Sequence, residues 1–179
     1  PYYFGTYSAA CIPAKVLLKL LGGSQSRAFP LTNIASWIAA LLVTFFFLKR
    51  SRRTVLITLL LLMCAPIFPY YFWPSAEMFL YALVTCGAVF LVNQQFKLSA
   101  LFISVAGTLN ATVMAFGFFV IILFVYQSVV VFKKVHDRFR PVIFVKENVK
   151  RTLLLAACYI PFVVVAIFNT VEYGGPVPQ

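Results

Sequence analysis

The chain has 179 residues, of which 63% are hydrophobic and only 11% are charged, and its mean hydropathy is +0.96. A soluble domain is about half apolar and a quarter charged, so this composition excludes an ordinary soluble globular protein and indicates an integral membrane protein. The formal charge of +11 lies mostly beside apolar stretches. That placement is typical of the positive-inside rule and of anionic lipid contacts, so we expect membrane lipids as partners and no nucleic acid.

The length limits how many times the chain can cross a membrane. A helical span needs about 20 apolar residues, so the sequence predicts an all-α polytopic bundle of about five to six transmembrane helices. We expect one transmembrane domain over residues 1–179 and no separate soluble domain. The chain starts at Pro1 without an initiator Met or a signal peptide, and we expect it to be an internal fragment of a longer protein.

The first element in chain order is a helix over about residues 7–21 that lies at the membrane interface. Lys15 and Lys19 are four residues apart and therefore share one helical face, while apolar residues occupy the other faces. This pattern favours an interfacial helix over a full span. Gly22 and Gly23 are expected to end it.

The spans that follow are separated by basic segments. Expected spans cover residues 30–48, 54–68, 75–92, two helices within 98–132, and 152–168. The basic segments at 49–53, 93–97 and 133–151 alternate with outer segments that carry Glu77 and Glu172. The positive-inside rule assigns the basic segments to the cytoplasm, and we expect the inner membrane of a bacterium.

Two turns on the outer side carry the polar residues of interest. Ser75 is a plausible N-cap for the span that begins there, and Glu77 follows two residues later. The uncharged stretch from 98 to 132 is too long for one span, and its polar interruption at Thr108–Thr112 predicts an outer turn between two helices. Asn110 lies in that turn.

The residues of common catalytic and metal sites are sparse. One histidine, His136, and four scattered cysteines cannot supply a metal site with the usual spacing. Paired carboxylates and a Gly-rich phosphate loop are absent from the sequence. No cofactor is evident, and no complete catalytic site can be assembled from this chain.

Glu77 admits two interpretations. A carboxylate in the first turn of a helix is favoured by the helix dipole and by free backbone N–H groups, which is a capping role. Alternatively, Glu77 lines an outer cavity with Tyr70, Tyr71 and Trp73, because acids at membrane depth usually face a cavity or a partner. An aromatic belt at the membrane interface explains the same aromatic residues.

Four stretches of the sequence resemble membrane glycosyltransferases of the GT-C fold that use polyprenyl-phosphate donors, particularly the bacterial relatives of dolichyl-phosphate-mannose protein mannosyltransferases. They are Tyr2–Tyr7 leading to Leu17–Gly22, Leu31-Thr32-Asn33, Ala65-Pro66 with an aromatic loop and Ser75-Ala76-Glu77, and Asn169–Pro176. The third resembles the "P, short loop, S-x-E" passage of that family. The fourth resembles its N-x-x-x-(F/Y)-G-x-P sequence.

The resemblance implies transfer of a sugar from a polyprenyl-phosphate donor to an acceptor at the outer face, with inversion at the anomeric carbon. The catalytic acid of that family lies in an outer loop before the matched region, so it is expected upstream of Pro1, where the full-length enzyme could also hold a divalent metal. In this chain, Glu77, Asn110, Asn169 and Tyr173 are the expected substrate-binding residues. Asn110 stands where relatives often carry Arg.

Two other classes of function remain open from the residues. A small transporter or lipid flippase predicts a polar pathway across the bilayer and paired repeats with broken helices, and no internal repeat is visible in the sequence. A non-catalytic membrane scaffold predicts packed spans and nothing more. Helix-packing and turn roles are the default for each of the four binding candidates.

Overall fold

A computed structural model describes residues 4–64, 75–135 and 141–173 of the chain. Within these ranges the regular elements are all helical, which confirms the expected all-α class. The α-helices are α1 (Phe4–Ala10), α2 (Ile12–Leu20), α3 (Ala28–Phe47), α4 (Arg52–Met63), α5 (Glu77–Val92), α6 (Phe96–Leu109), α7 (Met114–Val135), α8 (Pro141–Ala157) and α9 (Ile160–Tyr173). Two short 3-10 helices, η1 (Gln25–Arg27) and η3 (Ala111–Val113), precede α3 and α7.

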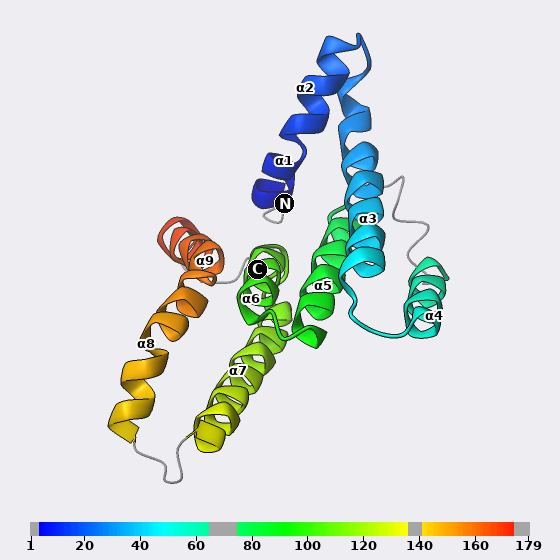
Figure 1. The fold of residues 1–179 in the computed structure, drawn as a ribbon. Coiled ribbons are helices and arrows are strands. Elements are labelled where there is room, and N and C mark those ends of the chain that lie inside the picture. Colours follow the sequence, from blue (N-terminus) through cyan, green and yellow to red (C-terminus); the bar gives the residue numbers. More distant parts are fainter. Residues whose placement is uncertain (1–3, 65–74, 136–140, 174–179) are drawn as a thin grey trace.

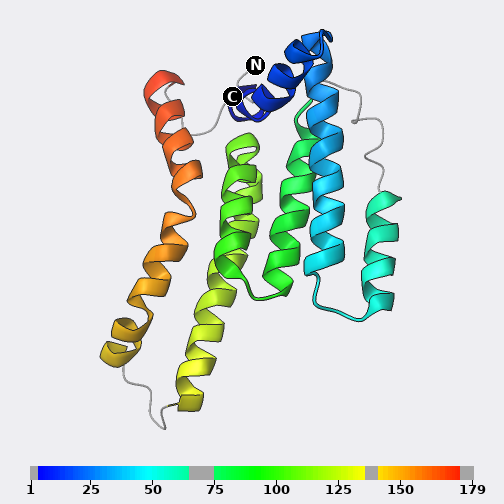
Figure 2. The ribbon, with the colours of Figure 1, turned by 45° about the horizontal axis from the view of Figure 1, so that its top comes forward.

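The long helices alternate in direction and form a layer (Figures 1 and 2). Helix α5 packs between α3 and α6, helix α6 also contacts α7 and α9, and α4 lies against α3. The last turns of α3, α5 and α7 therefore lie at one end of the molecule, which is rich in basic residues, and the starts of α3, α5 and η3 lie at the other (Figure 2). We call these the basic end and the distal end.

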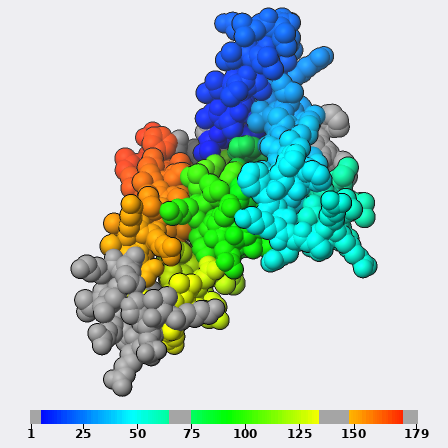
Figure 3. All heavy atoms as spheres, in the orientation of Figure 1, coloured from blue at the N-terminus to red at the C-terminus, as the bar shows by residue number. Residues whose placement is uncertain are grey.

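Helices α1 and α2 form an arm that crosses the distal end and projects from it (Figures 1 and 3). The arm is close to the expected interfacial helix, except that it breaks at Cys11, because Pro13 has no N–H to continue the backbone ladder. It ends in a Schellman motif: Gly22 has φ of 70°, and the Gly23 N–H donates to the Leu18 carbonyl at 2.8 Å. Leu20 is 79% exposed, so the arm presents an apolar surface.

The core lies where α3, α5 and α6 meet. Trp37 and Ala40 of α3 pack against Met78, Ala82 and Phe90 of α5. The close approach of α5 to α6 depends on glycine: a Cβ at position 87 would lie 2.7 Å from Cδ1 of Ile103, which is fully buried. Small residues at helix contacts are the usual means by which membrane helices approach closely.

The number of helices that could cross a membrane is two to three within the described residues. Residues 25–47 and 111–133 form helices that are long and apolar enough, and the pair 148–157 and 160–172, bent by 47°, adds one more if it counts as one span. Helices α5 and α6 are apolar but have only 16 and 14 residues. The expected interruption of the 98–132 stretch is confirmed, since η3 separates α6 from α7.

Three sequence-based boundaries are wrong. The expected basic loop over 133–151 is largely helical, because α7 continues to Val135 and α8 begins at Pro141, a residue type favoured at the first helical position. The expected span at 152–168 therefore starts earlier, and it bends after Ala157. At its other end, α9 continues through Asn169 to Tyr173, where an exit loop was expected.

Candidate functional site

A buried hydrogen-bond junction at the distal end joins the arm, α3 and Ser75, which lies two residues before the start of α5. Tyr7 donates its hydroxyl proton to Oδ1 of Asn33 at 2.7 Å, and the hydroxyl also lies 3.3 Å from the Phe29 carbonyl. Asn33 donates from Nδ2 to the Ser75 carbonyl at 3.2 Å. Tyr7 and Asn33 are both fully buried. We call these three residues the Tyr7–Asn33–Ser75 junction.

Apolar groups surround the Tyr7 ring and exclude water from the junction. Its ring centroid lies 5.6 Å from that of Phe29 and 5.7 Å from that of Phe79, and Leu109 at the end of α6 belongs to the same cluster. Burial raises the pKa of the Tyr7 hydroxyl well above its usual range, and the negative charge of Glu77 adds to the effect. A tyrosine hydroxyl is protonated at physiological pH even without this shift, so Tyr7 acts as a hydrogen-bond donor here.

Sequence reasoning did not identify Tyr7 or Asn33 as functional residues. Both lie in stretches that carry the family resemblance, but the sequence did not single out either residue as a binding candidate. The available signal was Asn33 itself, because an amide within an apolar span is expensive unless a partner satisfies it. A tyrosine 26 residues earlier could not be recognised as that partner from the sequence.

Glu77 is the first residue of α5, and its side chain is exposed. This position satisfies the helix-dipole role predicted for it. The prediction that Ser75 caps the helix is wrong: the N-cap is Ala76, and the hydroxyl of Ser75 finds no partner in the described part of the chain. Asn33 instead holds the Ser75 carbonyl. Tyr70, Tyr71 and Trp73 lie outside the described residues.

Asn110 occupies the expected turn between α6 and α7, also at the distal end. Its Oδ1 accepts hydrogen bonds from the Thr112 backbone N–H at 3.1 Å and from the Thr112 hydroxyl at 2.6 Å. The side chain is the N-cap of η3. The turn role is thus observed, and Leu109, the residue before it, packs in the cluster around Tyr7.

Asn169 and Tyr173 are not brought to the junction. Both belong to α9, which contacts α6 on the side away from α5 (Figures 1 and 2). Asn169 is half-buried, and Tyr173 is the last residue of the helix. The four predicted binding residues therefore divide into Glu77 and Asn110 near the arm, and Asn169 and Tyr173 on α9.

Two cavities border α7. An apolar groove of about 370 Å³ runs between α7 and the bent pair α8–α9, with Gly117, Ile121, Ala156 and Tyr159 among its walls. The hydroxyl of Tyr159 donates to the Gly117 carbonyl at 2.9 Å, which ties the bend to α7.

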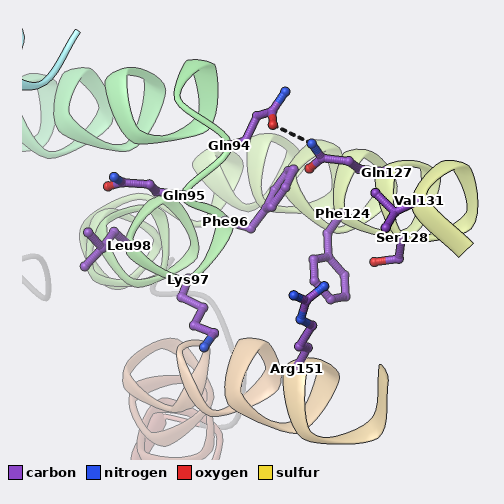
Figure 4. Close-up of a pocket in the computed structure, with 10 residues that line it drawn as sticks. All are labelled: Gln94, Gln95, Phe96, Lys97, Leu98, Phe124, Gln127, Ser128, Val131 and Arg151. Atoms are coloured by element: carbon purple, nitrogen blue, oxygen red, sulfur yellow. Dashed lines mark hydrogen bonds between the residues drawn. The ribbon is translucent and has the colours of Figure 1, made fainter. Parts of the chain in front are cut away.

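The second cavity, of about 600 Å³, opens at the basic end (Figure 4). Its lining residues are Gln94, Gln95, Phe96, Lys97, Leu98, Phe124, Gln127, Ser128, Val131 and Arg151. Sequence reasoning used Lys97 only to assign topology and did not expect a cavity here. Helices α6, α7 and α8 come together at this point, and that convergence is not visible in local sequence.

The turn that enters this cavity holds a residue in an unusual backbone conformation. Gln94 has φ of 61°, in the left-handed region that favours glycine. The Gln95 N–H donates to the Phe90 carbonyl at 2.9 Å, which completes a Schellman motif. Gln127 donates from Nε2 to Oε1 of Gln94 at 2.5 Å, so a side-chain contact with α7 accompanies the strained residue.

The described residues contain no group of three metal-ligating side chains. Comparison with protein-family models, with curated proteins and with solved structures finds no match to this chain. Function is therefore inferred from the residues and geometry of the chain itself.

Proposed function

We propose that the chain is part of a bacterial membrane glycosyltransferase of the GT-C type, an enzyme of the cell envelope that transfers a sugar from a polyprenyl-phosphate donor to an acceptor at the outer face. The catalytic acid belongs to a segment before Pro1. The chain supplies a helical scaffold and residues that contact the substrates.

The Tyr7–Asn33–Ser75 junction is the observation that carries this proposal. Three of the four stretches with the family resemblance lie far apart in the sequence, and their residues meet at this junction through hydrogen bonds of 2.7 and 3.2 Å. Such a junction fixes the arm relative to the starts of α3 and α5. Residues before the arm would thereby be held close to Glu77 and to the turn at Asn110.

The proposed topology has five to six spans, with the basic end in the cytoplasm and the distal end outside. The alternating helix directions and the clustering of Lys49–Arg53, Lys97 and Arg151 at one end support it. Helix α5, with 16 residues, is roughly 24 Å long at 1.5 Å per residue. It would cross with local thinning of the bilayer, as short spans do.

In this arrangement Glu77 accepts hydrogen bonds from sugar hydroxyls, and Asn110 donates from its amide nitrogen. Asn169 and Tyr173 contact the donor or acceptor from the α9 side. Glu77 is suited to such a role because it is exposed and begins α5 two residues after Ser75 of the junction.

The test is transfer from a radiolabelled polyprenyl-phosphate sugar by the full-length protein that carries this chain, in membranes. Glu77→Gln should lower kcat/KM by about tenfold or more, since a hydrogen bond to a charged group is worth about 1.5–3 kcal/mol. Glu172→Gln is the comparison, because it removes an exposed carboxylate near the end of α9, and it should lower transfer less than Glu77→Gln does.

Two results would contradict the proposal. Wild-type protein that transfers no sugar from any polyprenyl-phosphate donor would refute the glycosyltransferase assignment. Unchanged transfer by Glu77→Gln, together with reduced thermal stability, would return Glu77 to the capping role.

A further inference from the structure

The cavity at the basic end combines two cationic side chains with amide groups. Lys97 extends from the first turn of α6 and Arg151 from α8, and both reach toward the space between these helices (Figure 4). Gln127 and Gln94, joined by their hydrogen bond, lie at the α7 side of the same cavity. The Lys97 ammonium and the Arg151 guanidinium are donors that match the oxygens of a phosphate group, whereas the two glutamines lie beyond Phe96 and Phe124 (Figure 4).

Among the described residues that line the cavity there are two cations and no carboxylate. Glu77 lies at the start of α5 and Glu172 near the end of α9, so both are at the opposite end of their helices from the cavity. A cavity with this charge favours an anionic occupant.

The apolar groove continues from the cationic cavity along the same two helices. On α7 the wall residues Gly117, Ile121, Phe124, Ser128 and Val131 recur every three or four positions, so they lie on one helical face. On α8 the lining passes from Arg151 in the cavity to Thr152, Leu155 and Ala156 in the groove. On α8 the lining thus changes from the cationic Arg151 to the apolar Leu155 and Ala156, whereas the α7 face is apolar apart from Ser128.

We propose that this cavity and groove bind a phospholipid with an anionic headgroup. The headgroup phosphate lies between Lys97 and Arg151, and one acyl chain lies along the groove between α7 and α8–α9. The two cations favour an anionic headgroup. The apolar groove beside them favours a lipid over a free phosphate, because only a lipid has an acyl chain to fill it. In the proposed topology this site faces the cytoplasmic leaflet, which is rich in anionic lipid. Lipid binding here does not depend on the proposed sugar transfer.

Native mass spectrometry of the purified full-length protein that carries this chain, in detergent, tests the headgroup contacts directly. Phosphatidylglycerol and phosphatidylcholine with identical acyl chains are titrated against the wild type, Lys97→Gln/Arg151→Gln and Arg52→Gln/Arg53→Gln. The last variant is a matched control, because it also removes two exposed cations from the basic end, but neither residue lines the cavity.

We expect the wild type to prefer phosphatidylglycerol over phosphatidylcholine by at least tenfold. The Lys97→Gln/Arg151→Gln variant should lose about thirtyfold in affinity for phosphatidylglycerol, because each cation beside an anionic headgroup contributes a factor of about five. The Arg52→Gln/Arg53→Gln variant should bind within about twofold of the wild type. Arg52 and Arg53 do not contact the headgroup, and salt screens the attraction of exposed charges at a distance. Equal binding by both double variants would overturn the proposal.

The groove is tested by a second matched pair. Ala156→Phe fills the groove, whereas Ala157→Phe adds the same side chain at an exposed neighbouring position that does not line it. Phosphatidylglycerol affinity should fall severalfold in the first variant only. Equal loss in both variants, or competition by soluble glycerophosphoglycerol at the concentration of the lipid, would overturn the lipid assignment. Helical circular dichroism and a single elution peak establish that each variant is folded.

Discussion

The two interfaces made by the central helices differ in how closely the helices approach. Between α5 and α6, glycine, alanine and serine residues allow near contact, and Gly87, Ala100 and Ile103 are all buried. Between α7 and the bent pair α8–α9, a groove and a cavity remain. The wall residue Phe118 there is 66% exposed.

The difference follows from side-chain size. Apolar attraction cannot drive helices together in lipid, so contact depends on close packing of small residues and on interhelical hydrogen bonds. Helices α5 and α6 have such residues along their shared face. The facing surfaces of α7 and α8–α9 carry larger apolar groups, which contact lipid as readily as protein. The first interface is therefore suited to a scaffold, and the second to a ligand.

The largest expected effect comes from breaking the tight interface with Gly87→Leu. A Cβ at this position would lie 2.7 Å from Cδ1 and 2.9 Å from Cγ1 of Ile103, so either the buried Ile103 side chain or the α5–α6 contact must shift, and the rest of a leucine side chain adds to the crowding. Overpacking of this kind costs about 3 kcal/mol. Unfolding in mixed detergent micelles containing increasing sodium dodecyl sulfate should show a correspondingly lower midpoint.

Gly117→Leu is the control on the loose interface. Its nearest neighbour to a new Cβ is Cε1 of Tyr159 at 3.2 Å, and the groove beside it can receive the remaining atoms. The loss of stability should be less than half of that at position 87. Equal losses would show that the two interfaces do not differ in packing.

The positions of several helices could be predicted from the sequence, but the contrast between the two interfaces could not. The apolar stretches and the basic segments between them correctly located α3 and α5, and the polar interruption correctly located the division between α6 and α7. The boundaries of α8 and α9 could not be predicted in this way, because charged residues within 141–151 resemble a solvated loop while their backbone is helical. Helix length there is decided by helix propensity, and charge pattern reports only proximity to the membrane surface.

The candidate sites were less predictable than the helices. Glu77 and Asn110 were identified because each is a polar residue at a helix end, and helix ends are visible in local sequence. The contact between Tyr7 and Asn33, and the meeting of Lys97 with Arg151, depend on which helices are neighbours in space. Helix order within a layer is set by tertiary packing, which local pattern does not encode.

A second prediction tests the Tyr7–Asn33–Ser75 junction, which attaches the arm to the starts of α3 and α5. Tyr7→Phe keeps the aromatic packing but removes the donor to Oδ1 of Asn33. Loss of a buried hydrogen bond with one partner left behind costs about 2 kcal/mol. The arm should then detach locally, so trypsin should cleave faster at Lys15 and Lys19.

Tyr126→Phe is the control for this variant. Tyr126 lies on α7 and is 67% exposed, so removal of its hydroxyl should change neither stability nor the cleavage rate. Unaltered protection of Lys15 and Lys19 in Tyr7→Phe would mean that aromatic packing alone holds the arm.

The smallest expected effect concerns the contact between α6 and the start of α9, which lies between the α5–α6 interface and the groove beside α7. The first N–H groups of a helix have no partner within it, and the Phe162 N–H in the first turn of α9 instead donates to Oγ of Ser104 at 3.1 Å. Ser104→Ala should therefore destabilise the protein by about 1 kcal/mol.

Ser99→Ala provides a stringent comparison, because Ser99 is equally buried on the same helix but its hydroxyl has no hydrogen-bond partner among the described residues. Its replacement should be neutral or stabilising in the same detergent titration, because an unsatisfied buried hydroxyl is unfavourable. Equal destabilisation by the two substitutions would show that side-chain volume, and not the bond to α9, accounts for the role of serine in α6.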